Sequence, residues 1–242
     1  MKEASFRVST LMERKRFYEK EFSLARVKNW FHTKKLPLPQ ICALDAGTDS
    51  KVMKKRSWNN TLFYVRFDEM LEKALAYLPE DIYYDRNQYD DVEKVLQTLR
   101  FPRTEQQELA FDVDANNISC THAKVREVCE QCLKKVLEAT RLLVKELRER
   151  FQYQNIALTY SGRGFHVHVL DEKAFRLSYS ERSALARCFQ KFPIDPWVTR
   201  SYIRLLRVPF TLNGVVSRIA TPLTTLNDLS FRIRSIPQFL RR

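Results

Sequence analysis

The chain has 242 residues, of which 44% are hydrophobic and 12% aromatic, and this composition excludes an intrinsically disordered protein. No apolar run reaches the roughly 20 residues of a membrane span, and the N-terminal segment lacks the apolar core of a signal peptide. We therefore expect a cytoplasmic or nuclear protein that is neither secreted nor inserted in a membrane. The net charge of +13 divides into +8 for residues 1–60, −5 for 61–172 and +10 for 173–242. Basic flanks around an acidic centre favour a nucleic acid or nucleotide partner, the alternative being a solvated basic surface.

Apolar periodicity predicts an α+β protein that forms one domain over residues 1–242, centred on a mixed or antiparallel sheet. No repeat, low-complexity tract or Gly/Ser linker divides the chain. In chain order, the predicted elements are helix 10–33, loop 32–51, strand 61–67, helix 68–78, strand 108–115, helix 122–151, strands 155–162 and 164–171, and helix 178–192.

Two acidic residues stand two apart in the predicted strand of "FDVDANN". Asp112 and Asp114 should therefore project from one face, while Phe111 and Val113 point into the core. Two carboxylates at this spacing repel each other unless they are protonated or bridged by a cation. Hard divalent ions such as Mg²⁺ accept carboxylate oxygens together with substrate phosphates as ligands. The pair is a candidate metal site, and the alternative is an exposed strand edge with two solvated acids.

Four potential zinc ligands fall within thirteen residues in the pattern C-x-H-x6-C-x2-C. They are Cys120, His122, Cys129 and Cys132. Zinc favours such a tetrahedral set of sulfur and nitrogen atoms, and a filled set is structural rather than catalytic. An odd total of five cysteines with one tight cluster also favours metal binding over a disulfide framework. The alternative is a pair of cysteines facing a helix core beside a surface histidine.

Two of the four glycines lie within three residues in "YSGRGFHVHVLD". Such spacing predicts a tight connection with positive φ and a close approach of the backbone to a ligand. Ser161, Arg163 and the nearby backbone amides are donors that suit phosphate oxygens. His166 and His168 share one face of the next strand; His166 is the better candidate for a phosphate contact, and His168 fits a partly buried sheet position. The alternative is a glycine-containing hairpin with an exposed arginine.

A third acid, Asp195, stands between two prolines in "FPIDPWVTRSYIRLLRVPFTLNG". Behind it Arg200, Arg204 and Arg207 recur at i, i+4 and i+7, a spacing that predicts one basic helical face. A carboxylate followed by a basic stripe is able to complete a metal pair and bind phosphate. The alternative is a polar helix face with solvated arginines.

Taken in this order, the motifs resemble the catalytic small subunit of archaeal and eukaryotic DNA primase, within the archaeo-eukaryotic primase superfamily. The resemblance rests on "ELAFDVDANN", the Cys/His cluster after it, "YSGRGFHVHVLDE" and "PIDPWVTRSYIRLLRVPFTLNG", and covers most of residues 10–225. It implies a primase small-subunit-like catalytic module in which mixed or antiparallel sheets are flanked by helices, with a zinc knuckle at residues 120–132.

The resemblance also implies a role for each motif residue. The aspartates would bind the catalytic Mg²⁺ or Mn²⁺, and they are Asp112, Asp114 and Asp195. The nucleotide-binding residues would be Ser161, Arg163, His166, Arg207 and, from "KRSW", Arg56. The structural Zn²⁺ would be held by Cys120, His122, Cys129 and Cys132.

The chain departs from the family pattern at three places. The Ser-Gly…Gly-x-His element is one residue shorter than usual and has a single Arg163, and Asn213 stands where the family has a histidine. Only 28 residues separate His166 from Asp195, where many relatives insert a helical subdomain. We therefore expect a compact version with no large helical insertion.

The activity that the resemblance implies is that of a DNA primase, a nucleotidyltransferase of the DNA-directed RNA polymerase type that acts in DNA replication. It would make short RNA or mixed RNA/DNA primers on single-stranded DNA from nucleoside triphosphates by two-metal-ion catalysis, in a primosome with a primase large subunit. One alternative is a gap-filling or end-joining primase-polymerase, which would share the site but prefer primed DNA ends. Another is a non-catalytic, zinc-containing nucleic-acid-binding subunit, which would not need the three aspartates.

Overall fold

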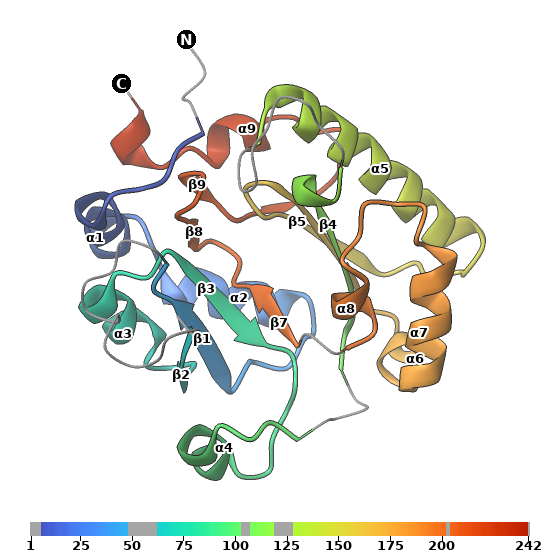
Figure 1. The fold of residues 1–242 in the computed structure, drawn as a ribbon, viewed down its shortest axis with the longest axis horizontal. Coiled ribbons are helices and arrows are strands. Elements are labelled where there is room, and N and C mark those ends of the chain that lie inside the picture. Colours follow the sequence, from blue (N-terminus) through green and yellow to red (C-terminus); the bar gives the residue numbers. More distant parts are fainter. Residues whose placement is uncertain (1–5, 48–61, 103–106, 119–127, 202–203, 242) are drawn as a thin grey trace.

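The computed structural model describes residues 6–47, 62–102, 107–118, 128–201 and 204–241 (Figure 1). Within them the chain forms two four-stranded antiparallel sheets and a two-stranded ribbon. The first sheet runs in the order β2 (Leu62–Arg66), β1 (Ile41–Asp45), β3 (Asp81–Asp85), β7 (Leu205–Arg207). The second runs in the order β10 (Thr221–Leu223), β5 (Ile156–Tyr160), β6 (Gly164–Val169), β4 (Leu109–Asp114). The ribbon pairs β8 (Leu212–Asn213) with β9 (Arg218–Ile219).

Helices flank both sheets, which confirms the α+β class with antiparallel sheets that the sequence predicts. The α-helices are α1 (Leu11–Lys20), α2 (Leu24–Thr33), α3 (Met70–Tyr77), α4 (Val92–Thr98), α5 (Glu130–Glu149), α6 (Glu172–Phe175), α7 (Tyr179–Cys188), α8 (Pro196–Thr199) and α9 (Phe231–Arg234). Two 3₁₀ turns are η1 (Ala115–Asn117) and η2 (Gln238–Leu240). No helix in the described ranges combines the length and the apolar character needed to cross a bilayer.

One face of the second sheet packs against α5 and α7, which lie on the side away from the first sheet in Figure 1. The alternation predicted for β4 is confirmed, because Phe111 and Val113 are fully buried in this core while Asp112 and Asp114 remain partly exposed on the other face. Helix α5 begins at Glu130, later than predicted, and the Cys129 side chain caps its first turn. The long amphipathic helix α5 therefore packs its apolar face against the face of the sheet opposite to Asp112 and Asp114.

Helix α2 joins the two sheets. Its Phe31 ring packs edge-on against Tyr84 of β3 at 5.0 Å between centroids, and its Trp30 ring packs against His168 of β6 at 5.3 Å. The predicted helix 10–33 is in fact two helices, since the chain breaks after α1 and restarts at the N-cap Ser23, whose hydroxyl accepts a hydrogen bond from the Arg26 amide. The break lets α2 enter the space between the sheets.

The predicted loop at 32–51 is wrong in its centre, because Ile41–Asp45 forms β1, an inner strand of the first sheet. Four of its five residues are buried, so the strand is covered on both faces. A strand of this kind shows no alternation of apolar and polar residues, and the prolines just before it resemble a loop.

Candidate active site

A hollow of about 90 Å³ lies between the two sheets, where the edge strand β4 of the second sheet comes near the edge strand β7 of the first. It is far smaller than the roughly 300–1,000 Å³ of a typical ligand pocket, so it encloses a charged group rather than a whole ligand. Its lining includes Asp112, Asp114, Ser161, Arg163, His166, Arg207 and Asn213. The hollow thus brings together residues from several of the predicted motifs, which lie up to about 100 positions apart in the sequence.

Strand pairing sets the position of the two acids. In the antiparallel register of β4 with β6, Asp112 lies opposite His166 and Asp114 lies opposite Gly164. The Oδ1 atom of Asp112 is 3.6 Å from Nε2 of His166. The acid pair and the turn that follows β5 are therefore fixed relative to each other by backbone hydrogen bonds.

The ionised form of Asp112 is poorly compensated. Burial, followed by the charges of Asp114 and Asp195, raises the pKa of its carboxyl to about 8, and the charges of Arg163 and Arg207 offset this only in part. Its buried Oδ1 accepts no hydrogen bond from any described residue. A cation would relieve both effects, and carboxylate oxygens are the ligands that hard divalent ions prefer. Across the described residues, however, no three acidic, histidine or cysteine side chains already converge in a geometry that would hold a metal.

The backbone brings the third acid to the pair. The amide of Asp195 donates to the carbonyl of Asp112 at 2.8 Å, and Ile194 forms an isolated bridge with Val113. Asp195 caps α8, where its Oδ1 accepts from the Trp197 amide at 2.9 Å. Its side chain is outside the lining of the hollow, although its charge acts on Asp112.

The two glycines of the turn serve different purposes. Gly162 has a φ of +105°, as predicted for a tight connection. Gly164 does not have a positive φ, so that part of the prediction is wrong; a Cβ there would lie only 2.0 Å from the carbonyl oxygen of Val113. Its closest neighbour is thus the backbone of β4. The turn is further held by the Asn213 amide, which donates to the Ser161 carbonyl at 2.9 Å.

Arg163 points into the site rather than to solvent. Its side chain is 17% exposed, and Nη2 lies 3.1 Å from Oδ2 of Asp114. The alternative of an exposed hairpin arginine is therefore wrong. The guanidinium supplies a positive charge next to the acid pair, at a place where a phosphate oxygen would compete with Asp114 for the same donors.

The two histidines of β6 have different surroundings. His166 is 4% exposed, and burial, together with His168 and the cations of Arg207 and Arg86, holds its pKa well below the ordinary value. It is therefore neutral at pH 7. His168 is fully buried, with Nδ1 3.4 Å from Oε2 of Glu108, and belongs to the packing between the sheets.

Arg207 is a strand residue, not part of a basic helical face. Helix α8 ends at Thr199. Leu205–Arg207 then forms the strand β7, which pairs with β3 at the edge of the first sheet. Arg204 does not join it in the hollow; its guanidinium pairs with Asp85 and stacks 3.5 Å from the centroid of the Phe101 ring. The predicted stripe of three aligned arginines is wrong.

Asp81 of β3 is a residue of the site that the motif analysis missed. It forms a buried ion pair with Arg207. Burial lowers the pKa of Arg207, but the charge and hydrogen bond of Asp81, together with Tyr83 and Asp112, more than offset burial, so the pKa is raised. It also accepts hydrogen bonds from the Tyr83 hydroxyl at 3.2 Å and the Gly214 amide at 3.3 Å. The only sequence signal was alternation in "EDIYYD", which gives Asp81, Tyr83 and Asp85 one face.

The predicted zinc set is described only in part. Cys120 and His122 lie outside the described residues, as does Arg56. Of the other two ligands, the Sγ atoms of Cys129 and Cys132 are 3.4 Å apart at the start of α5. Two sulfurs bound to one tetrahedral zinc ion at about 2.3 Å each would lie about 3.8 Å apart, so the two thiols are slightly closer here than such a site requires. The zinc site stays a prediction.

Fold and site define an α+β protein with paired carboxylates and buried cations between two antiparallel sheets. The family model described as DNA primase small subunit matches residues 111–194. An uncharacterized DNA primase small subunit-like protein from Archaeoglobus fulgidus is 37% identical over 259 residues, which cover 97% of this chain and 91% of that protein. The chain therefore belongs to the DNA primase small subunit family.

Other relatives in the family are longer. The DNA primase small subunit PriS of Methanobrevibacter smithii is 29% identical over 75% of this chain and 52% of its own length. That of Thermococcus sibiricus is 31% identical over 74% of this chain and 49% of its own length. The chain thus spans about half the length of these two relatives.

Proposed function

We propose that the chain is a DNA-dependent nucleotidyltransferase that makes short RNA or mixed RNA/DNA primers on single-stranded DNA. The observation that carries the proposal is the convergence of Asp112 and Asp114 with Arg163, His166 and Arg207 around one small hollow. Carboxylates for metal ions beside cations for phosphates are what phosphoryl transfer requires. Family membership supports the same reading.

The acids would hold the catalytic metal ions. Asp112, Asp114 and Asp195 offer hard oxygen ligands, and the poorly compensated charge of Asp112 fits a bound cation. Two divalent ions, Mg²⁺ or Mn²⁺, would supply activation of the attacking 3′-hydroxyl and stabilisation of the leaving pyrophosphate. Strand β4 and the Asp195–Asp112 backbone bond keep the three carboxylates near each other.

The cations and the turn would bind the triphosphate. Arg207 is oriented by Asp81, so its guanidinium is fixed before the substrate arrives. Neutral His166 offers a ring N–H to a phosphate oxygen without bringing a second buried charge. Arg163 would exchange Asp114 for a phosphate once metal ions neutralise the acid, and the Ser161 hydroxyl would add a further donor.

Charge on the surface supports a nucleic acid partner. The two basic flanks of the sequence meet around a cavity of about 390 Å³, whose cationic lining residues are Lys20, Arg26, Arg234 and Arg241. Glu21, the one acid among the described lining residues, accepts a hydrogen bond from the Gln238 amide with its carboxylate oxygens. A primase large subunit is proposed as a further partner on the ground of family membership alone.

We further propose a structural Zn²⁺ on Cys120, His122, Cys129 and Cys132. The closeness of the two described thiols and the position of Cys129 at the N-cap of α5 support it. A closed set of four ligands leaves no open position for substrate, so the ion would stabilise the segment between β4 and α5.

Nucleotide addition on primed and unprimed templates tests the proposed function. The purified chain is incubated with single-stranded DNA, labelled ribo- or deoxyribonucleotides, and Mg²⁺ or Mn²⁺, with and without an annealed primer. We expect product on the unprimed template. Product only from annealed primers would favour the gap-filling or end-joining alternative, and template binding with no addition under any condition would favour the non-catalytic subunit.

A further inference from the structure

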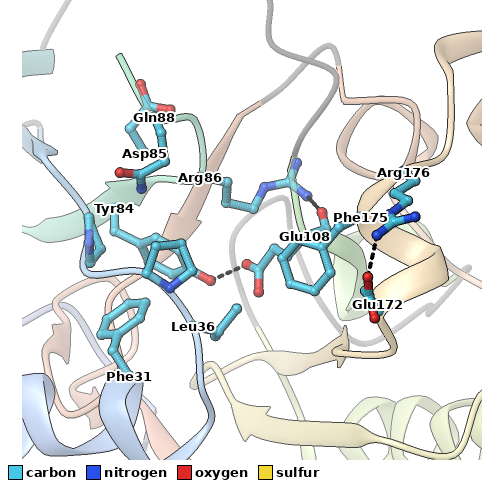
Figure 2. Close-up of a pocket in the computed structure, with 12 residues that line it drawn as sticks. Phe31, Leu36, Tyr84, Asp85, Arg86, Gln88, Glu108, Glu172, Phe175 and Arg176 are labelled. Carbon is cyan, nitrogen blue, oxygen red and sulfur yellow. Dashed lines mark hydrogen bonds and ion pairs between the residues drawn. The ribbon is translucent and has the colours of Figure 1, made fainter. Parts of the chain in front are cut away.

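Arg86 occupies a central position between the two sheets. It follows β3 directly, is only 5% exposed, and extends its guanidinium toward Glu108, as Figure 2 shows. Among the described residues, the guanidinium donates to three backbone carbonyls: Nη1 to Glu108 at 3.1 Å, Nη2 to Val198 at 3.0 Å and Nε to Arg204 at 3.2 Å. One side chain thus contacts three segments that are distant from one another in the sequence.

Each of the three segments leads into a different part of the candidate active site. Glu108 comes directly before β4, the strand of Asp112 and Asp114. Val198 lies in the short helix α8, whose N-cap is Asp195. Arg204 comes directly before β7, which ends at Arg207.

We infer that Arg86 is a positioning residue of the candidate active site, which sets the spacing between the three acids and the phosphate-binding arginine. The inference rests on the proposed function. The acid pair and Arg207 come from different sheets, and β4 and β7 do not pair with each other, so no sheet hydrogen bond fixes their separation. A planar guanidinium with N–H groups on three nitrogens is able to bind three carbonyls at once, whereas the single ammonium of lysine cannot span them.

Other contacts near Arg86 strengthen the same junction. The Tyr84 hydroxyl donates to the Glu108 carboxylate, and the backbone amide of Arg86 donates to the Arg204 carbonyl at 3.0 Å (Figure 2 shows the Tyr84 contact). Arg86, Tyr84 and Glu108 also line a cavity of about 440 Å³, so the junction is not backed by continuous packing. The guanidinium therefore has few substitutes if it is removed.

A second buried arginine provides a matched control. Arg182 of α7 is 1% exposed and donates to the same Glu108 carbonyl at 3.4 Å and to Gln107 at 2.6 Å. Its other acceptors are the carbonyls of Ala174 and Leu177, which lie near α6 and α7. Arg182 thus shares the burial and one acceptor of Arg86, but it does not connect β4 to Asp195 or Arg207.

The test compares Arg86→Lys with Arg182→Lys at a temperature where circular dichroism shows both variants to be folded. We expect both to lose thermal stability. Only Arg86→Lys should also lower kcat for template-directed addition, on the order of 10- to 100-fold, because small displacements of reacting groups cost that much. It should raise KM for the nucleotide as well. Arg182→Lys should stay within about threefold of the wild type in both constants, well below such a displacement effect.

Binding of Mn²⁺ alone, followed by electron paramagnetic resonance, gives a readout without catalysis. In Arg86→Lys the acids should be displaced, which should weaken Mn²⁺ binding by about tenfold, or about 1.4 kcal/mol of binding free energy. In Arg182→Lys the affinity for Mn²⁺ should be unchanged. If the unpaired ammonium prevents folding, the neutral Arg86→Gln takes its place. Equal effects of the two arginines, or none from Arg86, would overturn the inference. If the wild type adds no nucleotide, but its Mn²⁺ binding is weakened by Arg86→Lys and not by Arg182→Lys, the proposed function is contradicted and the inference is not.

Discussion

Replacing Asp112 by Asn should stabilise the metal-free protein at alkaline pH. Burial and then the charges of Asp114 and Asp195 raise the pKa of this carboxyl to about 8. An unfolded chain releases the same proton near pH 4. Between these values the folded state binds one proton more than the unfolded state, so stability falls as pH rises and levels off above about pH 8.

The size of the effect follows from the same two pKa values. With about 1.4 kcal/mol for each pKa unit, a difference of about four units sets an upper bound of about 6 kcal/mol above pH 8. The Asp112 side chain is 25% exposed, so water reduces this cost. We expect Asp112→Asn, which keeps the shape and removes the charge, to be more stable than the wild type by about 1–3 kcal/mol at pH 8.5.

Urea unfolding in the presence of a chelator, at pH 5 and pH 8.5, measures the difference. The stability difference between Asp112→Asn and the wild type should shrink markedly at pH 5. Asp90→Asn, a substitution at an exposed residue, should not change the free energy of unfolding comparably at either pH. Adding Mg²⁺ at pH 8.5 should stabilise the wild type but not Asp112→Asn. A variant that is equal to or less stable than the wild type at pH 8.5 would refute the claim that Asp112 carries an uncompensated charge.

Three further substitutions test other parts of the account. Arg163→Ala should weaken nucleotide binding about 10- to 100-fold, as loss of a charged hydrogen bond implies, and leave template affinity nearly unchanged. Fluorescence titrations measure both affinities, and loss of template binding with unchanged nucleotide affinity would show that the turn binds the DNA template instead. Metal analysis should find about one zinc per chain, and Cys129→Ser should lose it together with thermal stability before activity falls; carefully prepared protein without zinc would contradict this. Gly164→Ala should cost about 2–3 kcal/mol in urea unfolding, because its Cβ would lie 2.0 Å from the Val113 carbonyl, and an unchanged stability would mean that β4 and β6 can separate.

Local patterns were enough to predict the direction of the acid pair and the positive φ of Gly162. In β4 the buried Phe111 and Val113 alternate with Asp112 and Asp114, so the period of the strand alone gives the direction of the acids. The sequence could not reveal β1 in the same way, because burial on both faces removes the alternation.

Long-range pairing explains the other differences. Arg204 and Arg207 have helical spacing, but the pairing of Leu205–Arg207 with β3 overrides it and separates their side chains. Asp81 gains its role only from Arg207, which is 126 positions away. Arg86 likewise acts on carbonyls that are 22, 112 and 118 positions away, and a backbone acceptor leaves no mark in the amino-acid sequence.

The most direct test of the central claim is single-nucleotide incorporation opposite each of the four template bases. The wild type and Asp114→Asn are compared with Mg²⁺ or Mn²⁺ on otherwise identical templates. We predict that the wild type adds the complementary nucleotide at every template base and that Asp114→Asn, which keeps its fold, adds none. Incorporation that ignores the template base, or activity that survives in Asp114→Asn, would contradict the assignment of template-directed nucleotide addition to this site.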